Sequence, residues 1–219
     1  MPGTLYHLYF AKLTYEMATK AGIDLDLPSY AAGNLLPDTA KRKRYVHFYT
    51  QHHRSRFYVP DLVWAIAYYK EIRDVSLRLG AMAHLYLDGF FTMRVIARYF
   101  VFYPSRNRVY LRRNFEVSWS LEEFFSFQNG IYHVYSECNP LLLERENISM
   151  QWIRNYVPRD LPLTGLVELD DHNDDNWLDQ LERRLLDPPP YVGGMLTYDQ
   201  LVRPIEYAAQ AFVEKMLDD

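Results

Sequence analysis

Apolar residues recur at every third or fourth position along most of this chain, which is the spacing of an α-helix. The segment Leu5–Lys20 is predicted as a first helix. A longer helix is expected to start at a cap formed by Asp74 or Ser76 and to run to about Phe102, where Pro104 stops it. The dominant pattern is therefore helical.

Two capping boxes mark further helix starts, each with a Ser or Thr three residues before a Glu or Gln. The first, at Ser120, predicts a helix over 120–138, and a helix over 139–155 is expected to restart at Asn139-Pro140. The second, at Thr197, predicts a terminal helix that reaches Leu217. These elements extend the helical prediction to the end of the chain.

Two segments, Tyr45–Tyr49 and Val109–Leu111, are candidates for short strands. The polar stretch 159–176 and the Pro- and Gly-rich stretch 187–194 are too short to separate two independent domains. We therefore predict one all-α domain over residues 1–219, a bundle of about five to seven helices.

Charge and cysteine content exclude some classes of protein and of binding site. The formal net charge is -4, which argues against a general nucleic-acid binder held by phosphate attraction. The single cysteine, Cys138, excludes an intrachain disulfide and a multi-cysteine zinc site. No signal-peptide pattern and no long apolar run is visible, so we expect a cytoplasmic protein without stable membrane insertion.

Two predicted helices each carry a histidine and an acid four residues apart, His84 with Asp88 and His133 with Glu137. This spacing puts both side chains on one face, and imidazole with carboxylate is a common ligand set for zinc. About one such pair is expected by chance. Asp88 lies in an apolar segment and needs a partner, either a cation or hydrogen bonds, and His84 itself is the alternative.

Three further residues have candidate roles upstream. Asp38 follows Pro37 in an apolar loop, where a solvent-facing turn is the alternative, and His47 follows soon after it. His7 lies on an apolar helix face, where a histidine is most often part of the core. Singly, none of the three indicates a function.

The order of these residues resembles the zinc-dependent phospholipase C and P1-nuclease superfamily, and most closely its intracellular bacterial branch. The motifs span residues 2–137. In chain order they are His7, Gly33-x-x-x-Pro37-Asp38, His47-Phe48, Gly80 with His84-x-x-x-Asp88, and His133-x-x-x-Glu137.

The resemblance implies an all-helical fold with a metal cleft, in which up to three zinc ions hydrolyse phosphate esters. It assigns one zinc to Asp38, His47, His84 and Asp88. Asp88 would bridge to a second ion shared with His7, and the two aspartates would be the catalytic acids. We expect two ions, with Mn²⁺ or Fe²⁺ as alternatives to Zn²⁺.

The third ion would belong to His133 and Glu137, but the sequence departs from the family there. A further histidine normally follows the HxxxD aspartate, and this chain has Gly89 to Arg94 in its place. The site is therefore lost, or completed by water and substrate, or replaced by Arg94 acting as a phosphate clamp.

Two ligand assignments have alternatives. In the secreted relatives the free amino terminus is a ligand, so Pro2 is a candidate after removal of Met1. His47 is preferred to His52 and His53 because its distance from Asp38 matches the relatives, whereas His52-His53 lies in a polar stretch that is expected to be solvated.

The expected function is a metal-dependent phosphoester hydrolase that uses metal-bound hydroxide on a phosphate mono- or diester. The substrate would be a phosphate-ester small molecule or lipid head group, with nucleic acid only as a substrate. The alternative is a catalytically degenerate helical binding or scaffold protein with a residual structural metal. The oligomeric state stays open.

Overall fold

The computed structural model describes residues 3–52, 57–172, 177–186, 188–190 and 195–218. The chain forms a mostly helical single domain, as predicted, but it also contains two small antiparallel sheets, of which only short candidate strands were predicted. The described α-helices are α1 (Thr4–Lys20), α2 (Leu27–Gly33), α3 (Leu36–Thr39), α4 (Lys43–His47), α5 (Leu62–Tyr69), α6 (Val75–Phe91), α7 (Ala97–Tyr99), α8 (Leu121–Phe124), α9 (Ile131–Arg145), α10 (Met150–Tyr156), α11 (Val167–Asp170), α12 (Trp177–Leu186) and α13 (Tyr198–Asp218). The strands are β1 (Tyr49–Gln51), β2 (Tyr58–Pro60), β3 (Phe100–Tyr103), β4 (Arg108–Leu111) and β5 (Asn114–Ser120).

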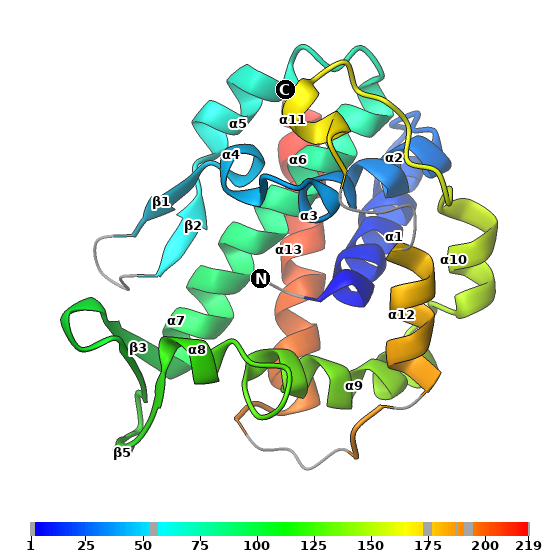
Figure 1. Ribbon diagram of the computed structural model, residues 1–219. Coiled ribbons are helices and arrows are strands. Elements are labelled where there is room, and N and C mark those ends of the chain that lie inside the picture. The colour runs from blue at the N-terminus through cyan, green and yellow to red at the C-terminus, as the bar shows by residue number, and fades with distance from the viewer. Residues whose placement is uncertain (1–2, 53–56, 173–176, 187, 191–194, 219) are drawn as a thin grey trace.

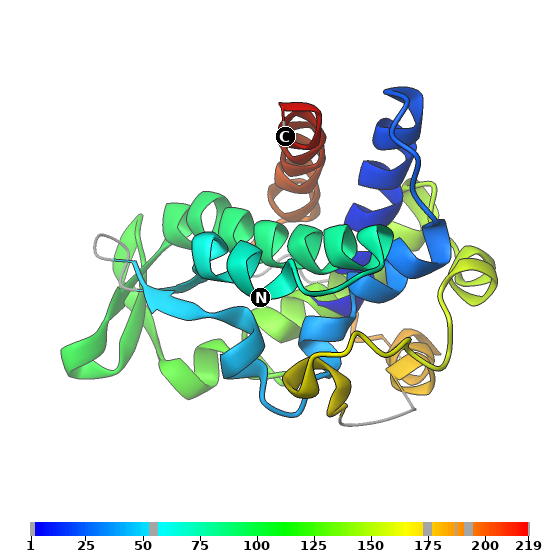
Figure 2. The same cartoon turned by 90° about the horizontal axis from the view of Figure 1, so that it is seen from above.

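Helix α6 lies at the centre of the molecule and is packed on by α1, α2, α5 and α13 (Figures 1 and 2). Asp74 caps its first turn, because the carboxylate accepts a hydrogen bond from the backbone N–H of Leu77 at 3.0 Å. Of the two residues predicted as the cap, Asp74 and Ser76, it is Asp74 that forms it. Its central position explains why α6 is apolar on nearly every face.

The crossing of α2 over α6 is unusually close. A Cβ at Gly33 would lie 2.1 Å from the carbonyl oxygen of Leu77, and a Cβ at Gly80 would lie 2.1 Å from that of Tyr30. Only glycine fits at either position without moving a helix. This contact brings the end of α2 and the chain that follows it against the middle of α6.

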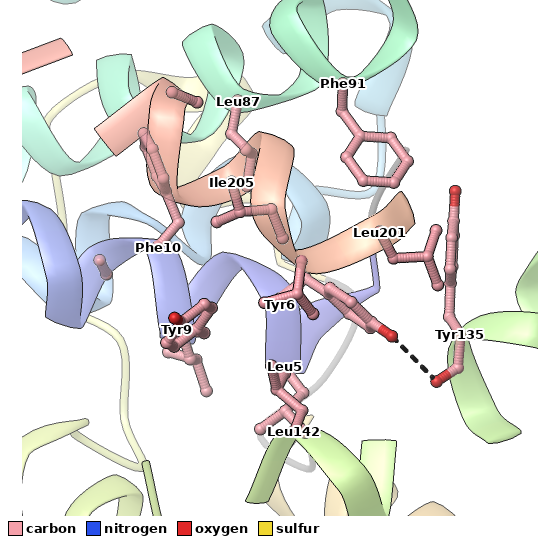
Figure 3. Packing of buried hydrophobic residues seen from close by; sticks show 14 of the residues in the cluster. Leu5, Tyr6, Tyr9, Phe10, Leu87, Phe91, Tyr135, Leu142, Leu201 and Ile205 are labelled. Atoms are coloured by element: carbon pink, nitrogen blue, oxygen red, sulfur yellow. Dashed lines mark hydrogen bonds between the residues drawn. The ribbon is translucent and has the colours of Figure 1, made fainter. Parts of the chain in front are cut away.

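The main core lies between α1, α6, α9 and α13 and is rich in large side chains (Figure 3). Tyr6 and Phe10 of α1 are fully buried, and the Tyr6 hydroxyl points to the carbonyl oxygen of Tyr135 at 3.5 Å. Full burial of each such side chain stabilises the fold by about 1.5–3 kcal/mol. This packing fixes the position of α1 and therefore also the position of His7, which lies on that helix.

The two sheets correct the all-α prediction. β1 pairs with β2, and β3, β4 and β5 form an antiparallel sheet in that order; both project from one end of the bundle (Figures 1 and 2). In β3, Phe100 and Phe102 are buried, whereas the residues between and after them are less so. This period of two is that of a strand.

The helix predicted to run to about Phe102 is confirmed as far as Tyr99, and only its last three residues are strand instead. α6 ends at Phe91, a π-helical turn follows over Thr92–Ile96, and α7 leads into β3. The predicted strand at Val109–Leu111 is confirmed within β4. The segment Tyr45–Tyr49 is instead the end of α4 and only the first residue of β1.

The capping boxes located two helix starts correctly, and the helix predicted from Thr197 to Leu217 is confirmed as α13, whereas the length predicted from Ser120 is wrong. The reciprocal hydrogen bonds of Ser120 and Glu123 are present, yet α8 ends at Phe124 and α9 begins after Gly130. α9 then runs through Pro140 to Arg145, so the predicted restart at that proline is wrong. Pro140 costs the helix one hydrogen bond, which its packing tolerates.

The box at Thr197 is also present, because Thr197 and Gln200 exchange backbone-to-side-chain hydrogen bonds at 2.8 and 3.3 Å. Within the residues that the structure describes, no helix is long and apolar enough to cross a membrane.

Candidate metal centre

His84 and Asp88 lie one turn apart on α6, and both are fully buried. On the neighbouring helix α1, His7 is also fully buried and stacks on His84 with ring centroids 3.8 Å apart. Nε2 of His7 lies 3.4 Å from Oδ1 of Asp88, and its Nδ1 has no hydrogen-bond partner among the described residues. The packing of α1 on α6 thus brings His7 next to His84 and Asp88, although they are far apart in the sequence.

Asp38 lies on α3 and His47 lies on α4, the two short helices that follow α2 in the chain. His47 ends α4, where the next residue, Phe48, adopts a left-handed conformation with φ of 50° and turns the chain away. Nε2 of His47 lies 3.8 Å from Oδ1 of Asp38 and 3.6 Å from Oδ2 of Asp88. All five predicted ligands of the first two ions therefore meet in one place.

Backbone carbonyls fix both imidazoles of this group. Nδ1 of His84 lies 2.8 Å from the carbonyl oxygen of Asn34, and Nδ1 of His47 lies 2.8 Å from that of Lys43. A carbonyl oxygen only accepts hydrogen bonds, so each Nδ1 carries the proton. In a neutral ring the Nε2 atom then presents a lone pair, which is the arrangement of a metal-ligating histidine.

The two Nε2 atoms point at each other across 3.2 Å. Two lone pairs at this distance repel unless a cation lies between them. Burial lowers the pKa of both His47 and His84, which disfavours a proton in that position. Two nitrogens bound to a tetrahedral zinc at about 2.0–2.1 Å would be about 3.3 Å apart, so the spacing fits a metal ion.

Among the residues that the structure describes, two overlapping groups of three side chains could hold a metal ion. One consists of His7, His84 and Asp88, and the other of Asp38, His47 and His84; in each, the ligand atoms lie within 4.8 Å of one another. Oδ1 of Asp88 faces His7, whereas its Oδ2 lies 3.6 Å from His47 and 4.0 Å from His84. The two oxygens thus face different histidines.

The acids of this centre are suited to a cation. Burial by itself would raise the pKa of Asp88, but nearby positive charge and its contact with His7 hold that pKa well below its usual range. The pKa of Asp38 is also lowered, because nearby positive charge, including that of Lys43, outweighs the effect of burial. Both carboxylates are therefore ionised at neutral pH.

Tyr49 supports the centre from outside. Its ring stacks on His47 at 4.9 Å, its hydroxyl is hydrogen-bonded to Asp88, and burial raises its pKa far above the usual value. A neutral phenol therefore donates to the carboxylate. No sequence pattern indicated this residue, because only the fold brings Tyr49 to Asp88.

The variant Tyr49→Phe is expected to bind zinc about 10- to 100-fold more weakly than the wild type, because the hydroxyl that orients Asp88 is lost. Competition with a chromogenic chelator measures the change. Tyr45→Phe is the matched control, since Tyr45 is 65% exposed. Equal zinc affinity in both variants would contradict a supporting role for Tyr49.

His133 and Glu137 form the predicted pair on α9, with Nε2 and Oε1 3.2 Å apart. Glu137 is buried, and its Oε2 has no hydrogen-bond partner among the described residues. Neither residue belongs to the two three-ligand groups. The third ion therefore stays a prediction.

Arg94 lies in the π-helical turn with an exposed side chain whose Cζ is 6.0 Å from the centre of the Phe90 ring. It is not among the residues that line the cavity at Asp38. Its role as a phosphate clamp also stays a prediction.

That cavity has a volume of about 350 Å³ and is bordered by Asp38, Lys43, Tyr132 and Arg184. Nζ of Lys43 lies 3.2 Å from Oδ1 of Asp38, and the guanidinium of Arg184 stacks on Phe127 at 4.9 Å. Two cations therefore border the cavity next to a candidate ligand. The basic run 41–44 was visible in the sequence, whereas no local pattern indicated Arg184.

Two of the alternative ligands, Pro2 and His53, lie outside the described residues. His52 is half-buried, and its backbone N–H donates to the carbonyl oxygen of Phe57 at 2.9 Å. The preference for His47 agrees with the geometry of the centre, since His47 belongs to one of the two groups.

Comparisons of the chain with protein-family models, with curated proteins and with solved structures found no match. The resemblance to the phospholipase C and P1-nuclease superfamily therefore stays a prediction that depends on the motif residues alone.

Proposed function

We propose that the buried centre binds zinc and that the protein is a metal-dependent phosphoester hydrolase. The observation that carries this proposal is the pair of Nε2 atoms, on His47 and His84, that face each other across 3.2 Å while each Nδ1 is held by a carbonyl oxygen. Residues that only packed a core would gain nothing from this arrangement.

Zinc is favoured because the donors are imidazole nitrogens and carboxylate oxygens, and Mn²⁺ and Fe²⁺ remain alternatives. Two ions suit the ligand set better than one. The single available nitrogen of His84 can serve only one ion, but Asp88 directs one oxygen to His7 and the other to His47, as a bridging carboxylate does.

Zinc, when bound, supplies a Lewis acid that polarises a phosphoryl oxygen and lowers the pKa of a water molecule. Residues of the chain would position the water and the phosphate. Asp38 is ionised and its side chain is 27% exposed at the cavity, so its carboxylate can orient an incoming water by accepting a hydrogen bond from it. Lys43 and Arg184 border the same cavity and would attract and orient the phosphate.

The substrate would be a phosphate mono- or diester small enough for a cavity of about 350 Å³. The competing function is a helical binding or scaffold protein in which the metal is structural. Both functions need the metal, so only turnover separates them.

Elemental analysis of the purified protein is expected to show one to three zinc ions per chain, most simply two. The same protein should hydrolyse p-nitrophenyl phosphate or bis(p-nitrophenyl) phosphate when Zn²⁺ or Mn²⁺ is added. A protein free of zinc, iron and manganese that also fails to bind them would overturn the proposal. Metal that raises the melting temperature without turnover of either ester would favour the scaffold function.

A further inference from the structure

The outer face of the three-stranded sheet carries a row of aromatic rings. Tyr103 and Tyr110 are in edge contact at 5.3 Å, and the ring of Phe115 stacks on Tyr110 at 5.8 Å with an interplanar angle of 28°. Tyr103 is 40% exposed and Phe115 is 52% exposed. The opposite face of the sheet is the buried one, because Phe100, Phe102 and Val109 point to the core.

Arginines lie around this row of aromatic rings, both on β4 and in the turns before and after it. Arg108 lies directly opposite Tyr103 in the β3–β4 pair and so points to the same outer face. Arg106 lies in the turn before β4, and Arg112 and Arg113 lie in the turn after it. Guanidinium groups therefore flank the aromatic row at both ends of β4.

The charge of this segment is opposite to that of the whole chain. Residues 98–120 contain five arginines and a single acid, Glu116, in a chain of formal net charge -4. Arg108 approaches Glu123 at 3.8 Å, and Arg112 donates to the carbonyl oxygen of Ala97 at 2.8 Å. The net charge of the chain therefore hides a local positive surface.

We propose that this face, which consists of Tyr103, Tyr110 and Phe115 with Arg106, Arg108, Arg112 and Arg113, binds single-stranded nucleic acid. Exposed rings stack on unpaired bases, and arginines on either side contact the phosphates. In a duplex the bases are already stacked on each other, so the rings would have no base to contact. The proposal does not depend on the metal centre, because it uses none of its residues.

An anionic membrane is the other polyanion that such a surface could meet. Membrane-binding loops place apolar side chains at their tips, where they enter the lipid. Here the tips are polar: residues 104–107 read Pro-Ser-Arg-Asn and residues 112–113 are two arginines. The aromatic rings lie instead on the flat face of the sheet, which favours stacking on bases.

Fluorescence anisotropy with labelled dT20 and rU20 tests the proposal. The wild type is expected to bind both, and Tyr103→Ala and Phe115→Ala should each weaken binding at least about fivefold. Arg106→Gln and Arg113→Gln should each lower the slope of log affinity against log salt by about 0.7. Tyr207→Ala and Arg203→Gln are the controls on α13, where Tyr207 is 69% exposed.

The oligonucleotide is recovered and checked on a denaturing gel, so that hydrolysis is not mistaken for weak binding. Zinc content and melting temperature are measured for every variant and should match those of the wild type, which separates this test from that of the metal centre. The proposal is overturned by absent binding, by equal losses in the control variants, by equal affinity for a dA20·dT20 duplex, or by binding only to phosphatidylserine-containing vesicles.

Discussion

The variant Asp88→Asn is expected to lose its bound metal and to hydrolyse phosphate esters on the order of 10³-fold more slowly than the wild type. Asp88 is the residue that both proposed ions would share, with one oxygen towards His7 and the other towards His47. An asparagine keeps the size of the side chain but offers only one neutral oxygen. Loss of about 4 kcal/mol of electrostatic stabilisation corresponds to this rate change.

Elemental analysis and the chromogenic phosphate assay measure the two effects on the same preparation. Asp199→Asn is the matched control, because this carboxylate is 64% exposed on α13 and belongs to neither ligand group. A variant that keeps full zinc content and full activity would contradict the assignment of Asp88. If Asp88→Asn loses its metal but the wild type already has no activity, the scaffold function is favoured instead.

The variant Gly80→Ala is expected to destabilise the protein by about 3 kcal/mol, since the added methyl group would lie 2.1 Å from the carbonyl oxygen of Tyr30. A backbone carbonyl cannot rotate away, so α2 has to move from α6. For a domain of this size, the melting temperature should fall by about 6–12 °C.

Gly89→Ala is the control on the same helix. The nearest atom to its added methyl group is Cδ of Pro60 at 3.8 Å, an ordinary contact, and alanine favours a helix by up to about 1 kcal/mol over glycine. Its melting temperature should stay the same or rise. Equal melting temperatures in the two variants would contradict the close crossing.

The variant Gly80→Ala should also bind zinc more weakly than the wild type. Asn34 follows α2 directly, and its carbonyl oxygen holds Nδ1 of His84 at 2.8 Å. Movement of α2 away from α6 therefore releases the ring that both ligand groups share. The glycine pair thus couples the stability of the fold to the geometry of the metal centre.

Local chemistry made some parts of the site predictable. His84 and Asp88 are four residues apart on one helix, so their shared face follows from the helix period alone. The caps at Asp74, Ser120 and Thr197 were likewise visible, because each depends on residues within one turn. Their predictions needed no knowledge of the fold.

Parts that depend on long-range packing were not predictable from the residues themselves. The contact of His7 with Asp88 requires α1 to pack on α6, and the role of Tyr49 requires β1 to lie beside it. The motif order suggested the first of these contacts through resemblance only. The second had no signal in the sequence.

The error at residues 100–102, which were predicted as the end of a helix, has a different origin. The apolar run that follows Asp88 continues past the end of α6 into β3, and periodicity does not separate a buried helix from a buried strand in so short a run. The alternation at Phe100 and Phe102 was the available signal. Reading it would have indicated the strand and the aromatic face that it helps to form.

The packing of α13 on α1 and α6 has a consequence for the order in which the protein matures. Every residue of the two ligand groups lies at or before Asp88, so all of them leave the ribosome long before Tyr198, where α13 begins. Until α13 is synthesised, the helices that carry His7 and His84 lack the partner that covers them. A nascent chain therefore contains the complete ligand set before it has the core that holds those ligands in place.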